Sequence, residues 1–261
     1  LPMLAAFGTV ANKYSMKNLI ILLTITWSLN IFATPESIPD RQRGEGPFER
    51  LILRGVIVIN GEGAPPAGPA DVLIEGNRIA QILNLGLYQP VPEDQRIPVL
   101  PGDRVMELDG HYLMPGFIDV HAHFGGDEQG VTAQYVAKLW LGHGITTIRE
   151  PGSFNGLDWV LSHQKRSEKN EIAAPRIIPY VSFGQGEEGP FLTEEEARSW
   201  VRKIAKQGAA GIKFFGAPAN IMRAALDEAG KQGLGSAMHH AQLDVVNWNA
   251  MDSARAGLNS M

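Results

Sequence analysis

Beyond Pro115 the sequence alternates short apolar segments, typical of buried strands, with longer amphipathic segments, typical of helices. The apolar segments read GFIDVHAH, GITTIRE, RIIPYVSF, GIKFF, LGSAMHH and LNSM. They recur at intervals of about 25 to 35 residues, the spacing of βα units, and such units build a parallel sheet. Five units are complete and a sixth begins. The alternation predicts an α/β fold, either a (β/α)₈ barrel or a doubly wound sheet.

The best-marked helix of this region is expected over residues 193–208. Thr193 and Glu196 have the spacing of a capping box, and Gly208 is a typical helix stop. Between these signals the apolar residues recur on one face, namely Ala197, Trp200, Val201, Ile204 and Ala205. Two earlier helices are predicted from the apolar sets Val131, Tyr135, Val136, Leu139 and Trp140, and Leu157, Val160 and Leu161.

The preceding residues, 48–112, are typical of a small β-module. β-Branched residues alternate in RLILRGVIVING, and turns are expected at residues 75–77 and 109–110, each between two apolar runs. Residues 34–47 are polar and rich in proline and glycine, which predicts a linker. The barrel domain is therefore expected over residues 113–261.

The first 33 residues have the pattern of a signal peptide. Met16 and Lys17 give a basic start, LIILLTITWSL supplies the apolar core, and Ala33 is the small residue at the expected cleavage point. This pattern predicts a secreted or periplasmic protein. An N-terminal membrane anchor is the alternative, but the apolar run is shorter than a typical span. Residues 1–15 precede the expected start methionine, and residues 1–33 are left out of the fold prediction.

The composition narrows the function classes. The 261 residues contain no cysteine, which excludes disulfides, thiolate nucleophiles and cysteine-bound zinc. The formal net charge is −5 and the Lys and Arg residues are scattered, so no basic surface for nucleic acid is expected. No other segment has an apolar run as long as that of the signal peptide, so no stable membrane anchor is predicted.

Two histidines lie two residues apart where the first apolar segment ends. In a strand, His121 and His123 would share one face with Asp119, and the opposite face would carry Ile118, Val120 and Ala122. In a barrel the apolar face would pack on the helices, and the histidines would point inward at the carboxyl end, where barrel active sites form. On this interpretation, the two imidazoles would bind one metal ion as a chelating pair. The alternative is a surface His-x-His sequence without a function.

Two further apolar segments contain potential metal ligands, one within the segment and the others directly after it. Lys213 lies inside the apolar segment GIKFF, where a buried amine is costly unless it is paired, neutralised or modified. It either extends its amine to the strand end or has a lowered pKa and adds CO₂ to form a carbamate. His239 and His240 follow the next strand, and because neighbours alternate, one of them faces the interior.

Other polar residues have competing interpretations. Glu150 ends GITTIRE and is either a metal or substrate contact or a structural carboxylate. Glu187 and Glu188 either meet substrate or lie in a solvated loop. The remaining histidines are interpreted as a turn residue and as surface or core residues; they are His111, His143 and His163.

The segment LMPGFIDVHAH, preceded by DVLIEGNRIAQI and VMELDGHYLMPG, resembles the amidohydrolase superfamily, particularly imidazolonepropionase-like and prolidase-like members. The likeness runs from Leu51 to Met261 and is strongest at the His-x-His segment. It implies a (β/α)₈ TIM barrel with a composite β-sandwich to which residues 48–112 contribute. The metal ligands that it implies are His121, His123, carboxylated Lys213 and His239, with His240 as the fallback.

The same resemblance implies the chemistry. The expected activity is hydrolysis of amide or cyclic-amide bonds in small molecules, and dipeptide-like substrates are favoured. The expected cofactor is zinc, with two ions in each site, and other divalent metals are the alternative. The family's strand-six histidine and catalytic aspartate would lie beyond Met261, so we expect a C-terminally truncated piece with an incomplete barrel. Such a piece is expected to self-associate, and a homo-oligomer is left open.

Two alternatives accompany this interpretation. A mononuclear deaminase-like enzyme would use a single metal without the carbamate. A catalytically incomplete secreted remnant or binding protein would retain only an incomplete metal site.

Overall fold

The computed structural model describes residues 36–86, 90–125, 130–240 and 247–261. The predicted signal peptide lies outside these residues. No helix within the described ranges has the length and apolar character needed to cross a membrane.

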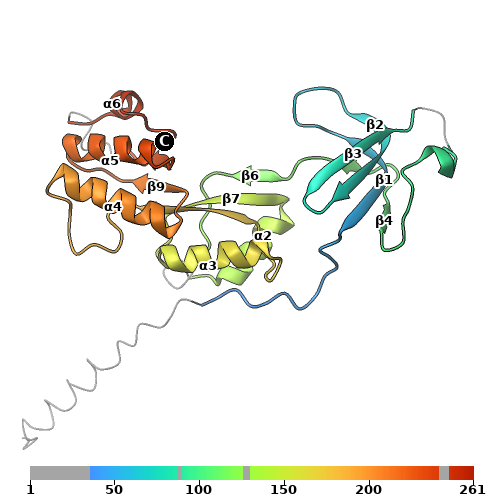
Figure 1. Cartoon of the computed structure of the whole chain (residues 1–261), viewed down its shortest axis with the longest axis horizontal. Helices are drawn as coiled ribbons and strands as arrows, with labels where there is room; N and C mark the ends of the chain where they lie inside the picture. Colours follow the sequence, from blue (N-terminus) through green and yellow to red (C-terminus); the bar gives the residue numbers. More distant parts are fainter. Residues whose placement is uncertain (1–35, 87–89, 126–129, 241–246) are drawn as a thin grey trace, which may run out of the picture. The chain divides into compact units, whose positions relative to one another are not determined.

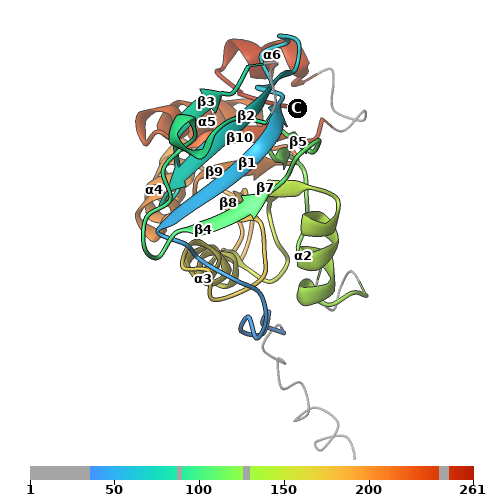
Figure 2. The same ribbon diagram turned by 90° about the vertical axis from the view of Figure 1, so that its right-hand side faces the viewer.

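The first sheet is formed by five strands: β1 (Arg50–Val58), β2 (Ala67–Glu75), β3 (Arg78–Asn84), β4 (Arg104–Glu107) and β5 (Tyr112–Leu113). Their order is β3-β2-β1-β4, and β5 also pairs with β1; Figure 2 shows β1 running between β2 and β4. A 3₁₀ turn, η1 (Glu93–Gln95), lies between β3 and β4. The predicted turn at residues 75–77 is confirmed, and Gly76 has the positive φ of 56° that favours glycine there.

Both faces of this first sheet are covered by apolar side chains. Ile52 pairs with Leu73 and Leu53 pairs with Val72, so adjacent residues of one strand enter two different buried clusters. In the described residues, strands β1 to β5 form a single sheet. The β-sandwich therefore stays a prediction.

The second sheet is parallel and contains β6 (Phe117–Asp119), β7 (Ile145–Pro151), β8 (Arg176–Ser182), β9 (Gly211–Phe214) and β10 (Gly235–Met238). Its order, β10-β9-β8-β7-β6, follows the chain without reversal. Figure 1 labels β6, β7 and β9 of this sheet. A doubly wound sheet reverses its strand order, so this sheet is a curled part of a (β/α)₈ barrel. Ser260 makes a parallel bridge to Ala237 and begins the sixth strand position.

The helices between these strands are α2 (Ala133–Gly142), α3 (Leu157–Glu168), α4 (Glu194–Gln207), α5 (Ala219–Lys231) and α6 (Ala250–Arg255). Their apolar faces pack on one side of the parallel sheet, against Ile148, Val181, Ile212 and Phe214. The predicted capping box of α4 is confirmed, and Gly208 ends the helix in the left-handed conformation.

Part of the predicted packing of the first barrel strand is wrong. Ile118 and Val120 are exposed, at 67% and 56%, instead of packing on helices. The physical reason is that β6 ends at Asp119 and forms the edge of the described sheet, while Ala122 and Phe124 enter the core near α2 in their place. In α2 itself the buried residues are Ala133, Val136 and Ala137, and the predicted apolar residues Tyr135 and Leu139 are exposed.

The face of the parallel sheet opposite the helices has its own close packing. The ring of Tyr180 lies over Gly211, where a Cβ atom would come within 2.3 Å of the ring. The guanidinium of Arg149 lies 5.1 Å from the centre of the same ring and also donates to Ser260 Oγ at 2.9 Å. Strand β7 is thus joined to the sixth strand position across this inner face.

Residues 36–47 contain no helix or strand, but they are attached to the barrel segment. Ile38 is buried in the same cluster as Val160 and Ile172. Its backbone N–H donates to Nε2 of the buried His163 at 3.0 Å. This stretch is therefore held against α3.

Candidate metal centre

The two histidines of the His-x-His segment lie directly after β6. Because Ala122 and Phe124 are buried on the helix side, His121 and His123 lie on the other face of the chain. Their ring centres are 5.4 Å apart and the rings stand nearly perpendicular. The chain bends at Val120 and His121, where the His121 N–H donates to Asp119 Oδ1 at 2.9 Å. The pair is thus close enough for both rings to reach one cation.

Glu150, at the end of β7, holds one of these rings. Its Oε1 lies 2.7 Å from Nδ1 of His123, and its Oε2 accepts from the Phe124 N–H at 2.8 Å. The carboxylate is completely buried. Of the two interpretations of Glu150 from the sequence, hydrogen bonding is the one seen in the structure. No local pattern in the sequence indicated that the partner is His123.

Lys213 occupies the middle of β9 and is 5% exposed. Burial, followed by the charge of Arg149, lowers the pKa of its amine. Burial, followed by the charge of Lys213, lowers the pKa of His121. Lys213 therefore lies near enough to the histidine pair for its charge to act on it. The lowered pKa favours the neutral amine, which is the form that can add CO₂.

The strand register separates His239 from His240. In the β9–β10 pairing, Ala237 lies opposite Lys213 and Met238 opposite Phe214. Paired residues share a face, and Met238 and Phe214 both belong to the core on the helix side. His239, one residue further, therefore lies on the face of Lys213, and its ring centre is 6.3 Å from that of Phe215.

His240 lies on the other side of the strand end. It lines a separate cavity of about 670 Å³ together with Met238 and Trp248. Its Nε2 atom is buried without a hydrogen-bond partner in the described structure. Geometry thus favours His239 as the histidine that faces the same side as Lys213.

The side chains at this site are of types that can bind a divalent metal. The nitrogen donors are the imidazoles of His121 and His123, the buried amine of Lys213 and the imidazole of His239. Nitrogen donors of this kind suit zinc, iron or cobalt. The described residues contain no cluster of three or more His, Cys, Asp and Glu side chains close enough to hold an ion.

The other candidate residues lie away from this face. His143 caps the C-terminus of α2, and His163 is buried within α3. Glu187 pairs with Lys203 at 2.8 Å on an exposed surface. His111 is in an exposed turn, where its ring bonds the Asp109 carbonyl at 3.3 Å. The interpretation of these histidines as turn, surface and core residues agrees with these positions.

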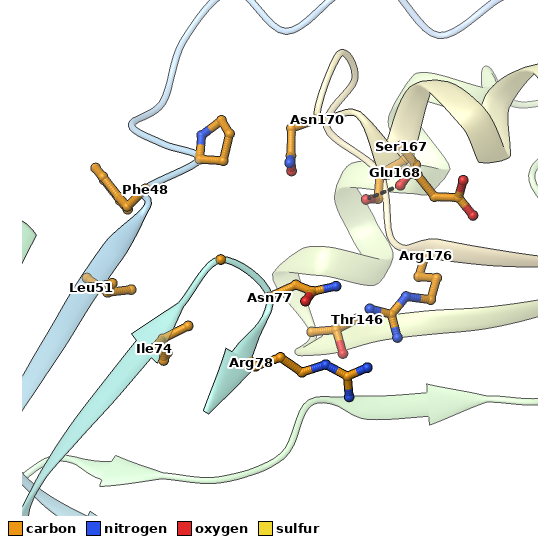
Figure 3. Close-up of a pocket in the computed structure, with 13 residues that line it drawn as sticks. Phe48, Leu51, Ile74, Asn77, Arg78, Thr146, Ser167, Glu168, Asn170 and Arg176 are labelled. Atoms are coloured by element: carbon orange, nitrogen blue, oxygen red, sulfur yellow. Dashed lines mark hydrogen bonds between the residues drawn. The ribbon is translucent and has the colours of Figure 1, made fainter. Parts of the chain in front are cut away.

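A large cavity elsewhere in the molecule has no connection with the histidines. Its volume is about 840 Å³, and its lining includes Thr146 and Arg176, at the amino ends of β7 and β8 (Figure 3). His121, His123 and Lys213 do not line it. In a parallel barrel, active sites form at the carboxyl ends of the strands, where the histidine pair lies.

Comparison with known proteins now decides the family. The amidohydrolase family matches residues 112–253, which is more than half of the chain and includes the His-x-His segment, Lys213 and His239. This chain belongs to the amidohydrolase family. The membership places the histidine pair, the lysine and the third histidine in one family domain.

Curated relatives of this amidohydrolase include a dihydroorotase of Staphylococcus aureus, 26% identical over 213 residues. The alignment covers 79% of this chain and 45% of the relative. An adenine deaminase of Bacillus velezensis is 27% identical over 154 residues, which cover 56% of this chain and 23% of that protein. The chain thus spans about half the length, or less, of these curated relatives.

Solved structures support the fold of the amidohydrolase chain. A Xaa-Pro dipeptidase with methionine bound in its active site is 20% identical, with a TM-score of 0.61, and the match covers 80% of this chain and 60% of that one. A prolidase complexed with N-methylphosphonate-L-proline is 19% identical, with a TM-score of 0.59 and the same coverage. At this identity the likeness shows the fold alone.

Proposed function

We propose that the protein is a metal-dependent hydrolase of carbon–nitrogen bonds in amides or cyclic amides. The observation that carries the proposal is the pair of imidazoles, His121 and His123, that follows the first barrel strand with ring centres 5.4 Å apart. His123 is held by a buried carboxylate and His121 is close enough to sense the charge of Lys213. A site of this kind, at this end of a barrel, is where the chemistry of the fold is performed.

Each residue of the proposed site has a separate role. His121 and His123 would hold one zinc ion, His239 would contribute to a second, and Lys213, as its carbamate, would bridge them. Bound zinc lowers the pKa of a water molecule and polarises the carbonyl of the substrate. The chain's own residues fix the ligands: the Glu150 carboxylate orients His123, and the packing of β9 holds Lys213 away from solvent.

Dipeptide-like molecules are the first substrate class proposed. Support comes from the fold likeness to a Xaa-Pro dipeptidase and a prolidase. The dihydroorotase relatives keep cyclic amides as the second class within the same reaction type.

The test is metal analysis of the full-length protein combined with hydrolysis of a dipeptide panel and of cyclic amides. We expect zinc to copurify and at least one amide to be cleaved. The double variant His121→Ala/His123→Ala should lose both, because the chelating pair is removed. The matched control, His143→Ala, removes a histidine from the exposed end of α2 and should change neither. Zinc content that is unaffected by the double variant would falsify the proposal.

One alternative has specific support, since the adenine deaminase relative is 27% identical to this chain. A mononuclear, deaminase-like site would not need the carbamate of Lys213. If Lys213→Ala keeps one metal per chain and full activity, while adenine is turned over and amides are not, the mononuclear reading replaces the binuclear one. Lys203→Ala, which removes an exposed lysine paired with Glu187, is the control. A full-length protein without metal or turnover would instead support the non-enzymatic remnant.

We also propose export from the cytoplasm. The support is the sequence pattern at residues 16–33, with a basic start, an apolar core and a small residue at position 33. Amino-terminal sequencing of the mature protein is expected to begin at Thr34. A mature chain that retains the apolar run would overturn the proposal.

A further inference from the structure

Glu150 is a completely buried carboxylate whose two oxygens both bind the segment that carries the histidine pair. Oε1 meets Nδ1 of His123 at 2.7 Å, and Oε2 accepts from the Phe124 N–H at 2.8 Å. The carboxylate therefore binds both a side chain and the next backbone amide along the chain.

The backbone brings this segment alongside Glu150. The Ala122 N–H donates to the Arg149 carbonyl at 3.1 Å, which continues the pairing of the first two barrel strands beyond the end of β6. On the opposite face of this segment, Ala122 and Phe124 are buried in the same core cluster as Ile148, and this packing holds the segment in place. His123 consequently stands beside the last residues of β7, within reach of the Glu150 side chain.

The chemistry of the two groups decides which nitrogen carries the proton. An ionised carboxylate can only accept hydrogen bonds, so Nδ1 of His123 must donate to it. A neutral imidazole has one N–H, and once this is on Nδ1, Nε2 has a free lone pair. The side chain of His123 is 34% exposed, so part of the ring is accessible. His123 is thus held in the tautomer that a metal ligand needs.

Burying a carboxylate costs free energy because the group loses its hydration. A buried ionised group is stable only when hydrogen bonds replace its hydration. Glu150 obtains such bonds from the Phe124 amide and from His123. No apolar side chain would fix the ring tautomer, whereas a carboxylate that accepts from Nδ1 does so.

We infer that Glu150 is a positioning residue that locks His123 as the Nδ1–H tautomer and so leaves Nε2 as the nitrogen that would bind a divalent cation. The zinc ligand role of His123 rests on the proposed function. The tautomer does not, because it is set by contacts within the chain. The two parts can therefore be tested separately.

The first measurement is long-range ¹H–¹⁵N NMR of the metal-free, full-length protein. We expect the His123 ring in the wild type to carry its proton on Nδ1. In Glu150→Ala the ring should shift toward the Nε2–H form, because the acceptor is gone. A change that affected only the stability of the fold would leave the tautomer unaltered. A wild-type His123 protonated on Nε2 would overturn the inference.

The second measurement is the affinity for Zn²⁺ alone, by calorimetry. We expect Glu150→Ala to bind zinc about 10 to 100 times more weakly, the range measured when such outer partners of ligands are removed. Glu150→Gln keeps the volume and one acceptor, so it should fold even if the alanine variant does not, and should recover part of the affinity. Glu187→Ala, which removes a surface carboxylate, is the control.

The outcomes separate the two proposals. Equal zinc affinity in the wild type and in both Glu150 variants would overturn the positioning role. A wild type that binds no zinc but holds His123 as Nδ1–H would overturn the proposed function and leave the tautomer lock supported.

Discussion

Tyr180 restricts which residues its neighbours in the parallel sheet can be. Its ring lies across the inner face, and a Cβ atom at Gly211 or Gly235 would approach it within 2.3 or 2.0 Å. Both glycines are in strands, where glycine is otherwise unfavourable, so close approach of the ring explains them. Arg149 lies on the same ring and helps to hold it in place.

Gly211→Ala is therefore expected to destabilise the protein by about 1 to 3 kcal/mol, the cost of overpacking a close-packed interior. The measurement is urea denaturation. Gly230→Ala is the matched control because nothing lies within 4 Å of its Cβ position in α5, and it should be neutral or stabilising by about 0.4 to 1 kcal/mol. Equal effects of the two substitutions would contradict the role of Tyr180.

Among the helices, α4 has the most complete set of end signals. The Thr193 side chain accepts from the Glu196 N–H at 3.2 Å, and Glu196 Oε2 accepts from the Thr193 N–H at 3.0 Å. The backbone N–H groups of Leu192 and Thr193 both donate to the Glu196 carboxylate and hold its pKa below the ordinary value. The apolar face of the helix packs Trp200 and Val201 into the core, so its start fixes where that face points.

Thr193→Ala should lower the free energy of unfolding by about 1 kcal/mol, the usual cost of a lost N-cap. Thr193→Ser keeps a hydroxyl acceptor and should stay close to the wild type. Chemical denaturation of the three proteins measures the difference. If serine is no better than alanine, the capping bond is not the source of the stability.

At the scale of the whole molecule, His163 ties residues 36–41 to the barrel segment. Its Nδ1 donates to the Trp159 carbonyl at 2.8 Å, and its Nε2 accepts from the Ile38 N–H. Burial lowers the pKa of this imidazole. The neutral ring is therefore the form that the fold requires, because a proton on Nε2 would face the Ile38 donor.

This predicts a pH dependence with a definite sign. Since the pKa of His163 is lower in the fold than in the unfolded chain, the unfolded chain takes up the proton first as pH falls. The contribution to stability is complete above the ordinary histidine pKa of about 6.5 and is lost below it. Thermal melts from pH 7.5 to 5 should show this loss, and hydrogen exchange should show earlier opening at Ile38. His163→Asn should weaken the pH dependence, whereas the exposed His111→Ala should not.

Local patterns in the sequence were sufficient for much of the barrel segment. The capping box at Thr193 and the turn at residues 75–77 are confirmed because each depends on neighbours within a few residues. The βα order indicated a parallel sheet, although the sequence alone left a doubly wound arrangement open. The site roles of His121, His123, Lys213 and His239 stay predictions.

Features that depend on distant residues needed the tertiary structure. Periodicity placed Ile118 and Val120 on a buried face, but burial requires a covering element, and β6 is an edge of the described sheet. The choice of His239 over His240 came from the β9–β10 register. The sequence by itself determined which potential metal ligands lie in or directly after the strands, because the alternation of side chains along a strand is a local property. Only the fold decided that Glu150 meets His123, because that contact joins residues 27 positions apart.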